Sequence, residues 1–174
     1  MMMDEGMDTG DILLQTEIPI GEEETSETLH DRLALLGAQL LLETVRGMKV
    51  GNIHPISQDH SKATYAPPLK KGDGQIDWNK EAEEIHRQVR ALNPWPGAFT
   101  EWNGQFLKIY KGEVREETSK RKAGIVSWVG SDFIEVGTGK DSFLIKEVQL
   151  EGKRRMAVRE FLSGHVITVG TVLG

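Results

Sequence analysis

A short acidic turn near the start of the chain carries the clearest chemical signal. Residues 8–11 read Asp-Thr-Gly-Asp, and the apolar run of residues 12–14 follows them directly. A carboxylate on a glycine-containing turn that leads into a buried strand can orient an imidazole or relay a proton. We therefore take Asp8 as the candidate catalytic residue. The alternative is that Asp8 only shapes the turn, since Asp side chains in such turns often accept hydrogen bonds from nearby backbone N–H groups.

Two groups of basic residues are candidates for contact with phosphate. Lys70 and Lys71 follow a pair of prolines in a connecting segment, where a mobile ammonium group suits a phosphate and carries no sequence information. A second group follows a predicted turn, so that its charges project together; it comprises Lys153, Arg154 and Arg155. For both groups the alternative is that the charges only keep the surface soluble.

The segment 93–96, which reads Asn-Pro-Trp-Pro, is the most specific motif in the chain. Two prolines fix the backbone on either side of Trp95, whose large apolar ring needs cover. This pattern predicts a rigid corner that packs a helix end onto a barrel. The functional alternative is that Trp95 stacks on a nucleic-acid base, which requires an exposed ring.

Composition bounds the class of protein. The chain has 174 residues, of which 38% are hydrophobic, and this is enough for one packed domain or two small ones. No run approaches the roughly 20 apolar residues that cross a bilayer, and the first residues lack the pattern of a secretory signal, so we expect a cytoplasmic protein with no membrane contact. There are no cysteines, and the five histidines show no metal-ligand spacing. We therefore expect no structural metal.

The net charge of -6 is unevenly distributed. Residues 1–68 carry 4 Lys and Arg against 12 Asp and Glu, whereas residues 69–174 carry 17 against 15. This difference predicts two distinct bodies, one acidic and one faintly basic. Domains that contact phosphates usually cluster their basic residues even when their net charge is small, and residues 120–122 and 153–155 are such clusters.

The first part of the chain has the pattern of an α/β domain. Residues 12–18 are apolar on both faces and end at a proline, which predicts a strand near the edge of a covered sheet. A helix is predicted to follow, capped by Thr25 or Ser26 and stopped by Gly47. Its leucines form a stripe at helical spacing that predicts a core face: Leu29, Leu33, Leu36 and Leu40, widened by Leu41 and Val45. Residues 48–74 are rich in proline and glycine and are typical of a connector between two bodies.

The second part of the chain has mostly strand signals. A helix is predicted over residues 79–92 and ends before Pro94, since the residue before proline avoids helical angles. Asn-Gly at 103–104 predicts a tight hairpin between two strands. The predicted strands are 98–102, 105–110, 124–129, 132–136 and 142–150, and a helical patch is predicted at 157–162. Short strands at this spacing with one flanking helix are typical of a small barrel, for which the open five-stranded OB-fold is the best match.

Three motifs together resemble the back half of the methionyl-tRNA formyltransferase family: D-T-G-D at 8–11, I-D-W at 76–78 and N-P-W-P at 93–96. The resemblance covers residues 3–174. It implies a fold of class α/β plus mostly β, with three parts. These are the C-terminal remnant of a Rossmann-like formyltransferase domain (1–50), a linker (51–74) and an OB-like C-terminal tRNA-binding domain (75–174).

The resemblance also implies a function. The family transfers a formyl group from 10-formyltetrahydrofolate to the α-amino group of initiator methionyl-tRNA, in the cytoplasm and without a metal, and we expect the full-length form to be a monomer. Asp8 matches the acid of the family's L-D-T-G-D motif, which acts beside an Asn and a His. Basic connector residues help to hold the tRNA in the family, and Lys71 aligns best with them.

The chain departs from the family in one respect. The Asn and His that act beside the acid have no counterpart in it, and the expectation is an N-terminally truncated form that is inactive alone. Two alternatives remain open. One is a relative that acts on another formyl acceptor, such as an amino-sugar nucleotide, or a formyltetrahydrofolate hydrolase. The other is a non-catalytic OB-like RNA-binding module.

Overall fold

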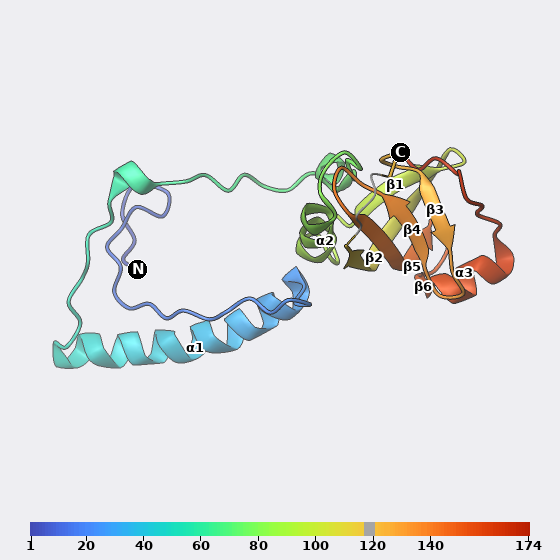
Figure 1. Ribbon diagram of the computed structural model, residues 1–174. Helices are drawn as coiled ribbons and strands as arrows, with labels where there is room; N and C mark the ends of the chain where they lie inside the picture. The colour runs from blue at the N-terminus through green and yellow to red at the C-terminus, as the bar shows by residue number, and fades with distance from the viewer. Residues whose placement is uncertain (117–120) are drawn as a thin grey trace. The chain divides into compact units, whose positions relative to one another are not determined.

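The computed structural model describes residues 1–116 and 121–174 of the chain. The described residues form two compact units, Met1–Pro68 and Leu69–Gly174 (Figure 1). Unit 1 contains one long helix, whereas unit 2 contains an antiparallel sheet and two shorter α-helices. In this part of the chain, no helix has both the length and the apolar character that a membrane span requires.

Unit 1 is built around helix α1, which spans Ser26–Val50. The hydroxyl of Thr25 accepts a 3.3 Å hydrogen bond from the N–H of Thr28, whose own hydroxyl accepts a 3.0 Å bond from the N–H of Thr25. This reciprocal capping box confirms Thr25 as the predicted cap. The predicted end at Gly47 is wrong. The helix continues to Val50 because the residue that adopts the left-handed conformation, with φ of 73°, is Gly51.

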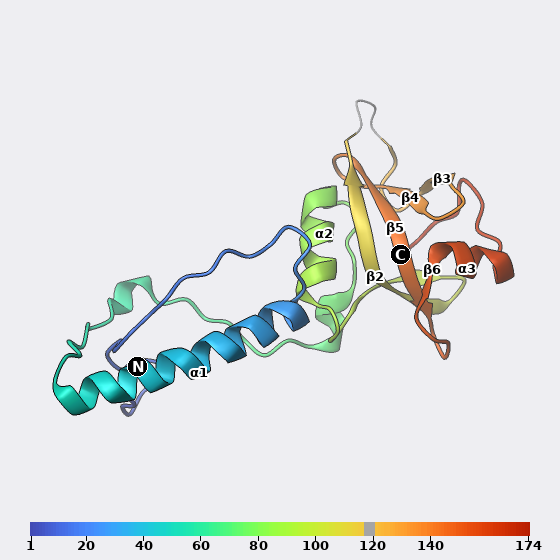
Figure 2. The ribbon, with the colours of Figure 1, turned by 90° about the horizontal axis from the view of Figure 1, so that it is seen from below.

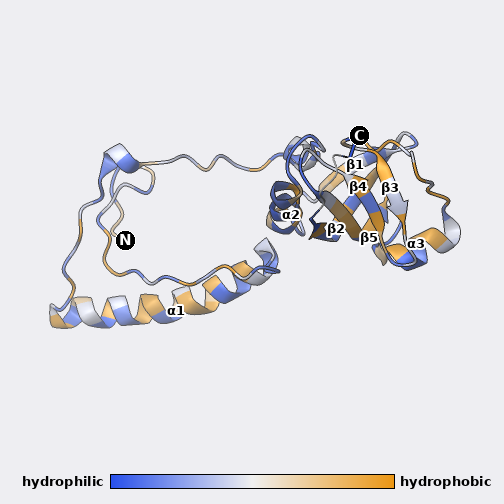
Figure 3. Cartoon of the chain, viewed as in Figure 1, coloured by the Kyte–Doolittle hydropathy of each residue, from blue (hydrophilic) through white to orange (hydrophobic). Residues whose placement is uncertain are grey.

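The apolar stripe of α1 is only partly covered. No residue of α1 is buried; Leu33 is 46% exposed, and Leu29, Leu36 and Leu40 are half-buried. Figure 3 shows the apolar residues of α1 as separate bands between polar ones along the helix. The prediction that this stripe forms a core face is therefore wrong within this chain, because unit 1 supplies no sheet for it to pack against.

The predicted strand at residues 12–18 does not form either. The segment makes one antiparallel bridge, in which the backbones of Ile12 and Ile56 exchange two hydrogen bonds of 2.9 Å. A strand needs a continuous ladder of partners, and residues 13–18 have none. Within unit 1, the segment that follows α1 contains one turn of 3₁₀ helix, η1, at His60–Lys62.

Unit 2 begins with a second 3₁₀ turn, η2 (Lys71–Gly74), and helix α2 (Ala82–Ala91). The strands are β1 (Ala98–Trp102), β2 (Gln105–Arg115), β3 (Val126–Val129), β4 (Ile134–Gly137), β5 (Ser142–Leu150) and β6 (Met156–Ala157), and helix α3 (Val158–Gly164) follows. The strand order is β1-β2-β5-β4-β3, with β6 paired to β5. Because β1 and β3 lie at opposite ends of this order, the sheet is open, and the predicted barrel is not confirmed.

The predicted hairpin is confirmed, as is the helix predicted before it, which spans residues 82–91 where 79–92 were predicted. Asn103 and Gly104 both have positive φ, as a tight two-residue turn between β1 and β2 requires. Strand β2 runs beyond its predicted end to Arg115, because β5 offers partners as far as Ser142. Helix α2 lies against β2, as Figure 2 shows, and buries Ala82, Ile85 and Val89; Leu92, at its C-cap, is also buried.

A single core holds unit 2 together. Phe143 of β5 and Phe161 of α3 are its largest fully buried side chains. Helix α3 packs on β5 and β6, so that the sheet is covered by helices from both ends of the unit. Burial of aromatic and aliphatic side chains on this scale dominates the stability of a small domain. Unit 2 therefore has the means to fold by itself, and unit 1 lacks a comparable core.

Candidate functional site

Asp8 lies on an exposed loop with a positive φ of 56°. The loop surrounds a pocket of about 210 Å³ lined by residues 1–4 and 6–10. The carboxylate that shapes this loop belongs to Asp4, which accepts hydrogen bonds from the N–H of Gly6 (3.1 Å) and the hydroxyl of Thr9 (2.6 Å). The Asp4 carboxylate thus shapes this loop from within.

The position of Asp8 is fixed by a distant side chain. Gln58 Nε2 donates to the backbone carbonyls of Asp8 (2.9 Å) and Gly10 (2.7 Å). The N–H of Met2 also donates to the carbonyl of Asp11 at 2.9 Å. Within residues 1–116 and 121–174, no histidine hydrogen-bonds to the Asp8 carboxylate. The chain therefore presents a carboxylate without the imidazole that would complete an acid–base pair.

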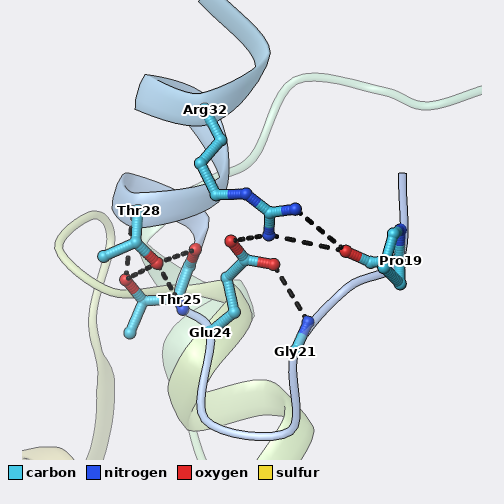
Figure 4. A network of polar contacts seen from close by, with 6 residues as sticks. All are labelled: Pro19, Gly21, Glu24, Thr25, Thr28 and Arg32. Atoms are coloured by element: carbon cyan, nitrogen blue, oxygen red, sulfur yellow. Dashed lines mark hydrogen bonds and ion pairs between the residues drawn. The ribbon is translucent and has the colours of Figure 1, made fainter. Parts of the chain in front are cut away.

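A polar network anchors the segment that runs from this loop into α1 (Figure 4). The guanidinium of Arg32 contacts Glu24 Oε1 at 2.5 Å and donates to the carbonyl of Pro19 at 3.4 Å. The other carboxylate oxygen of Glu24 accepts a 3.0 Å hydrogen bond from the N–H of Gly21. Because the Glu24 side chain is only 8% exposed, these contacts fix the entry into α1 more firmly than a solvated ion pair would.

Lys70 and Lys71 are exposed at the start of η2. This turn is rigid, because the Asp73 carboxylate accepts a 2.7 Å hydrogen bond from the N–H of Lys70. The segment just after it is tied to β1, because the N–H of Ile76 donates a 2.8 Å hydrogen bond to the carbonyl of Phe99. A Cβ atom on Gly74 would come within 2.1 Å of the carbonyl of Gly97, so this contact requires glycine. The structure thus places the two lysines on a fixed turn beside the end of the 93–96 corner.

The corner itself is held by polar contacts. Asn93 is buried and donates to the carbonyl of Tyr110 at 3.4 Å, and Lys108 Nζ donates to the carbonyl of Pro96 at 3.2 Å. The ring of Trp95 is 55% exposed. The prediction that Trp95 packs under cover is therefore wrong, because backbone and side-chain hydrogen bonds stabilise the corner without it. Its exposure meets the requirement of the stacking alternative.

The group at residues 153–155 is engaged in local ion pairs. Arg154 pairs with Glu160. Arg155 makes two hydrogen bonds with Glu147, of 2.8 and 2.7 Å, and its guanidinium lies 4.4 Å from the centroid of the Tyr110 ring. Lys153 is exposed. Arg155 thus joins the segment before β6 to β5 as well as carrying charge, and Lys153 and Arg154 are both exposed.

The cluster at residues 120–122 is only partly visible. Lys120 lies outside the described residues. Arg121 lies 4.0 Å from Glu135 Oε1, and Lys122 is exposed. Glu135 itself was missed by the sequence analysis, although it is fully buried in β4. The available signal was an acidic residue between Ile134 and Val136 in an otherwise apolar strand.

Among the residues that the structure describes, no group of three or more His, Asp or Glu side chains could hold a metal ion.

Comparison with known proteins identifies related families. Residues 68–166 match the family described as "Formyl transferase, C-terminal domain", and residues 1–45 match "Formyl transferase". The methionyl-tRNA formyltransferases of Desulfotalea psychrophila and Geobacter sulfurreducens are 47% and 46% identical to the chain, over 99% and 100% of its length. The match covers 54% of each of these relatives, so the chain spans about half the length of the curated relatives it matches.

Solved structures share the fold. HypX from Aquifex aeolicus in complex with tetrahydrofolic acid matches with a TM-score of 0.64 and 16% identity, over 97% of this chain and 32% of that one. The N-formyltransferase from Helicobacter canadensis, in complex with folinic acid and dTDP-3-aminofucose, matches with a TM-score of 0.63 and 20% identity, over 82% of this chain and 52% of that one. At these identities the likeness concerns the fold alone.

Proposed function

This chain belongs to the formyl transferase family, and we propose that it is the C-terminal portion of an enzyme that formylates the α-amino group of initiator methionyl-tRNA. The observation that carries the proposal is the identity of 47% with a methionyl-tRNA formyltransferase over 99% of the chain. The formyl donor in this proposal is 10-formyltetrahydrofolate, acting as a co-substrate. Two fold neighbours whose descriptions name a bound folate support that choice of donor.

In the proposed reaction the amine attacks the formyl carbon, loses a proton and forms a tetrahedral oxyanion that collapses to release tetrahydrofolate. Asp8 is the proposed acid–base residue. It either relays the amine proton or orients an imidazole that does so. Its exposed carboxylate, on a loop fixed by Gln58, supports this role. We assign no residue of this chain to the folate.

We propose three parts for the chain: residues 1–50 are the end of the Rossmann-like catalytic domain, 51–74 are a linker and 75–174 are an OB-like domain. The OB-like domain and the basic residues beside it are proposed to hold the tRNA. The exposed Lys70 and Lys71 are proposed to contact tRNA phosphates, as are Lys153, Arg154 and Arg155. The rigid turn of η2 supports the first pair, because lysines on a fixed turn lose less conformational freedom on binding. The full-length enzyme is proposed to be a cytoplasmic monomer.

This chain alone is proposed to lack formyltransferase activity. One carboxylate cannot by itself both activate the amine and stabilise the oxyanion, and mutual positioning of several groups supplies much of the rate in such reactions. Formyl transfer by purified residues 1–174 would contradict this part of the proposal.

The alternative acceptor, an amino-sugar nucleotide, has one supporting observation, which is the fold likeness to the Helicobacter canadensis enzyme at 20% identity. The test is a chimera that joins this chain to the part of the Desulfotalea psychrophila relative outside the match. It is supplied with 10-formyltetrahydrofolate and either methionyl-tRNA or a dTDP-amino sugar. We expect formylation of the tRNA only. Formylation of the sugar nucleotide in place of the tRNA would establish the alternative, and an inactive but folded chimera would count against both.

A further inference from the structure

Within unit 1, the segment after α1 returns to the loop that carries Asp8 (Figure 1). The backbones of Ile12 and Ile56 exchange two hydrogen bonds of 2.9 Å, and two residues further on the side chain of Gln58 reaches the loop. The sequence pattern gave residues 51–74 the role of a connector only. The structure instead places part of this connector directly against the candidate catalytic loop.

The contact is made by both hydrogens of one side-chain amide. Nε2 of Gln58 lies 2.9 Å from the carbonyl oxygen of Asp8 and 2.7 Å from that of Gly10. Because a carbonyl can only accept, these partners select the orientation in which the amide nitrogen, and not the amide oxygen, faces the loop. We call these two hydrogen bonds the Gln58 clamp. The clamp joins the two carbonyls that flank Thr9.

The backbone of Asp8 has a conformation that depends on such a restraint. Its φ of 56° lies in the left-handed region, which residues other than glycine adopt uncommonly. Conformations of this kind persist where surrounding contacts hold them, and they recur at functional sites. The hydrogen bond from Gln58 to the Asp8 carbonyl is such a contact. Its loss would allow the backbone to relax and the carboxylate to change direction.

The backbone that carries Gln58 is ordered on both sides. Before it, Ile56 pairs with Ile12. After it, the Asp59 carboxylate caps η1 by accepting hydrogen bonds from the N–H (3.0 Å) and the hydroxyl (2.6 Å) of Ser61. The side chain of Gln58 is itself half-buried. A side chain held in this way loses little conformational freedom when it makes its contacts, so the clamp is preorganised.

The far end of the loop is closed by its own backbone. The N–H of Met2 donates to the carbonyl of Asp11 at 2.9 Å, and a Cβ atom on the buried Gly10 would come within 2.0 Å of the carbonyl of Met2. These contacts fix residues 10 and 11. The clamp extends the restraint to Asp8, the residue that carries the carboxylate.

We propose that Gln58 is a positioning residue for Asp8. Its amide holds the loop in the conformation that presents the carboxylate, and a residue of the connector thereby sets the rate of formyl transfer. Because Gln58 acts on backbone carbonyls and not on a substrate, its loss should slow the chemical step without weakening substrate binding. The inference rests on the proposed function, since the rate concerned is that of the proposed reaction.

The first test measures the clamp without any reaction. Gln58→Met keeps the length of the side chain and removes both donors, and Gln39→Met, at an exposed position of α1, is the matched control. Hydrogen exchange of the Ile12 and Ile56 amides is followed by NMR in the 174-residue chain. We expect exchange to become about 5- to 150-fold faster in Gln58→Met, as for the loss of two hydrogen bonds, and to stay unchanged in Gln39→Met. Unchanged exchange in Gln58→Met would overturn the clamp.

The second test measures formylation of methionyl-tRNA by the chimera with the Desulfotalea psychrophila relative. We expect Gln58→Met to lower kcat roughly 10²-fold, as for a small misplacement of a reacting group, and to leave KM for the tRNA unchanged.

Two further variants separate hydrogen bonding from packing. Gln58→Lys supplies new donors and should recover part of kcat. Gln58→Glu has the native shape but only accepts when ionised, so it should recover none. If Gln58→Lys is no faster than Gln58→Met, or if Gln58→Glu has the wild-type kcat, the donors are not needed and the proposal is overturned. Circular dichroism checks the fold of each variant, and Gln58→Glu replaces Gln58→Met in both tests if the latter does not fold.

The combined outcomes distinguish this inference from the proposed function. If the wild-type chimera transfers no formyl group but exchange is faster in Gln58→Met, the proposed function fails and the clamp on the loop is supported. If exchange is also unchanged, both fail. If the chimera is active and Gln58→Met raises KM with kcat unchanged, the proposed function stands and the positioning role is overturned.

Discussion

The indole N–H of Trp78 donates a 3.0 Å hydrogen bond to the hydroxyl oxygen of Thr100, and both side chains are buried. This bond joins the segment before α2 to β1. We predict that Thr100→Val, which keeps the shape and removes the acceptor, lowers the free energy of unfolding by about 1–3 kcal/mol, because the indole N–H is left buried and unpaired. In a Trp78→Phe background, the same substitution should leave the free energy of unfolding nearly unchanged. Urea unfolding of the four variants measures both values, and equal costs in the two backgrounds would contradict a role for the bond.

The second prediction concerns the pKa of Asp77. The backbone N–H and side-chain amide of Asn79 donate to its carboxylate at 3.0 and 2.9 Å and hold the pKa of Asp77 below its ordinary value, with a smaller contribution from Lys80. A lowered pKa in the folded state stabilises the fold above the unfolded pKa, and this stabilisation is lost as pH falls through the folded pKa. We predict that Asn79→Ala raises the pKa of Asp77 and that Lys80→Ala raises it less. NMR titration of the Asp77 carboxyl carbon would refute this if the order were reversed.

Limited proteolysis should separate the two units. No residue of α1 is buried, and residues 51–68 are exposed almost throughout, whereas unit 2 has its own core. Exposed backbone without a core is cleaved first. We predict early cuts between about residue 51 and residue 68, and a resistant fragment that begins near Leu69 and is identified by mass spectrometry. A resistant core that includes α1 would show that the apolar stripe is covered in solution.

Binding of tRNA by the chain should depend strongly on salt. Each phosphate contact releases counterions, so the logarithm of affinity should fall with the logarithm of salt concentration by about 0.7 to 0.9 per contact. We predict that Lys70→Ala with Lys71→Ala lowers both the affinity and this slope. The triple variant of Lys153, Arg154 and Arg155 should do the same.

The chain should bind initiator and elongator tRNAs nearly equally, because phosphate contacts carry no sequence information. Titrations with both tRNAs, against the wild-type chain and the two variants, measure affinity, slope and selectivity. Binding that is independent of salt, or unaffected by both sets of substitutions, would remove these residues from the proposed interface.

Local signals predicted unit 2 well, because its elements are specified by nearby residues. The turn at Asn103-Gly104, the apolar face of α2 and the boundaries of β1 and β5 follow from periodicity and turn chemistry. The errors lie where the structure of a segment depends on a partner that is distant in the sequence. Residues 12–18 and the stripe of α1 have the right pattern for a sheet and its covering helix, but unit 1 provides neither a ladder nor a cover.

The candidate site was predictable to a similar extent. Asp8, Lys70 and Lys71 are exposed, and their roles remain predictions. In contrast, the exposure of Trp95 and the burial of Glu135 depend on packing between segments that no local motif encodes. The ion pairs that engage Arg154 and Arg155 likewise come from partners elsewhere in the fold.

The most direct test of the central claim is the rate of formyl transfer to methionyl-tRNA by the chimera that joins this chain to the remainder of the Desulfotalea psychrophila relative. We predict that Asp8→Asn preserves the fold and lowers the rate by about 10²- to 10⁴-fold, as expected for loss of a positioned acid–base group. Asp11→Asn, which changes a neighbouring acid of the same turn, is the matched control and should have a much smaller effect. An unchanged rate in the Asp8→Asn chimera would contradict the account and make Asp8 a residue of the turn only.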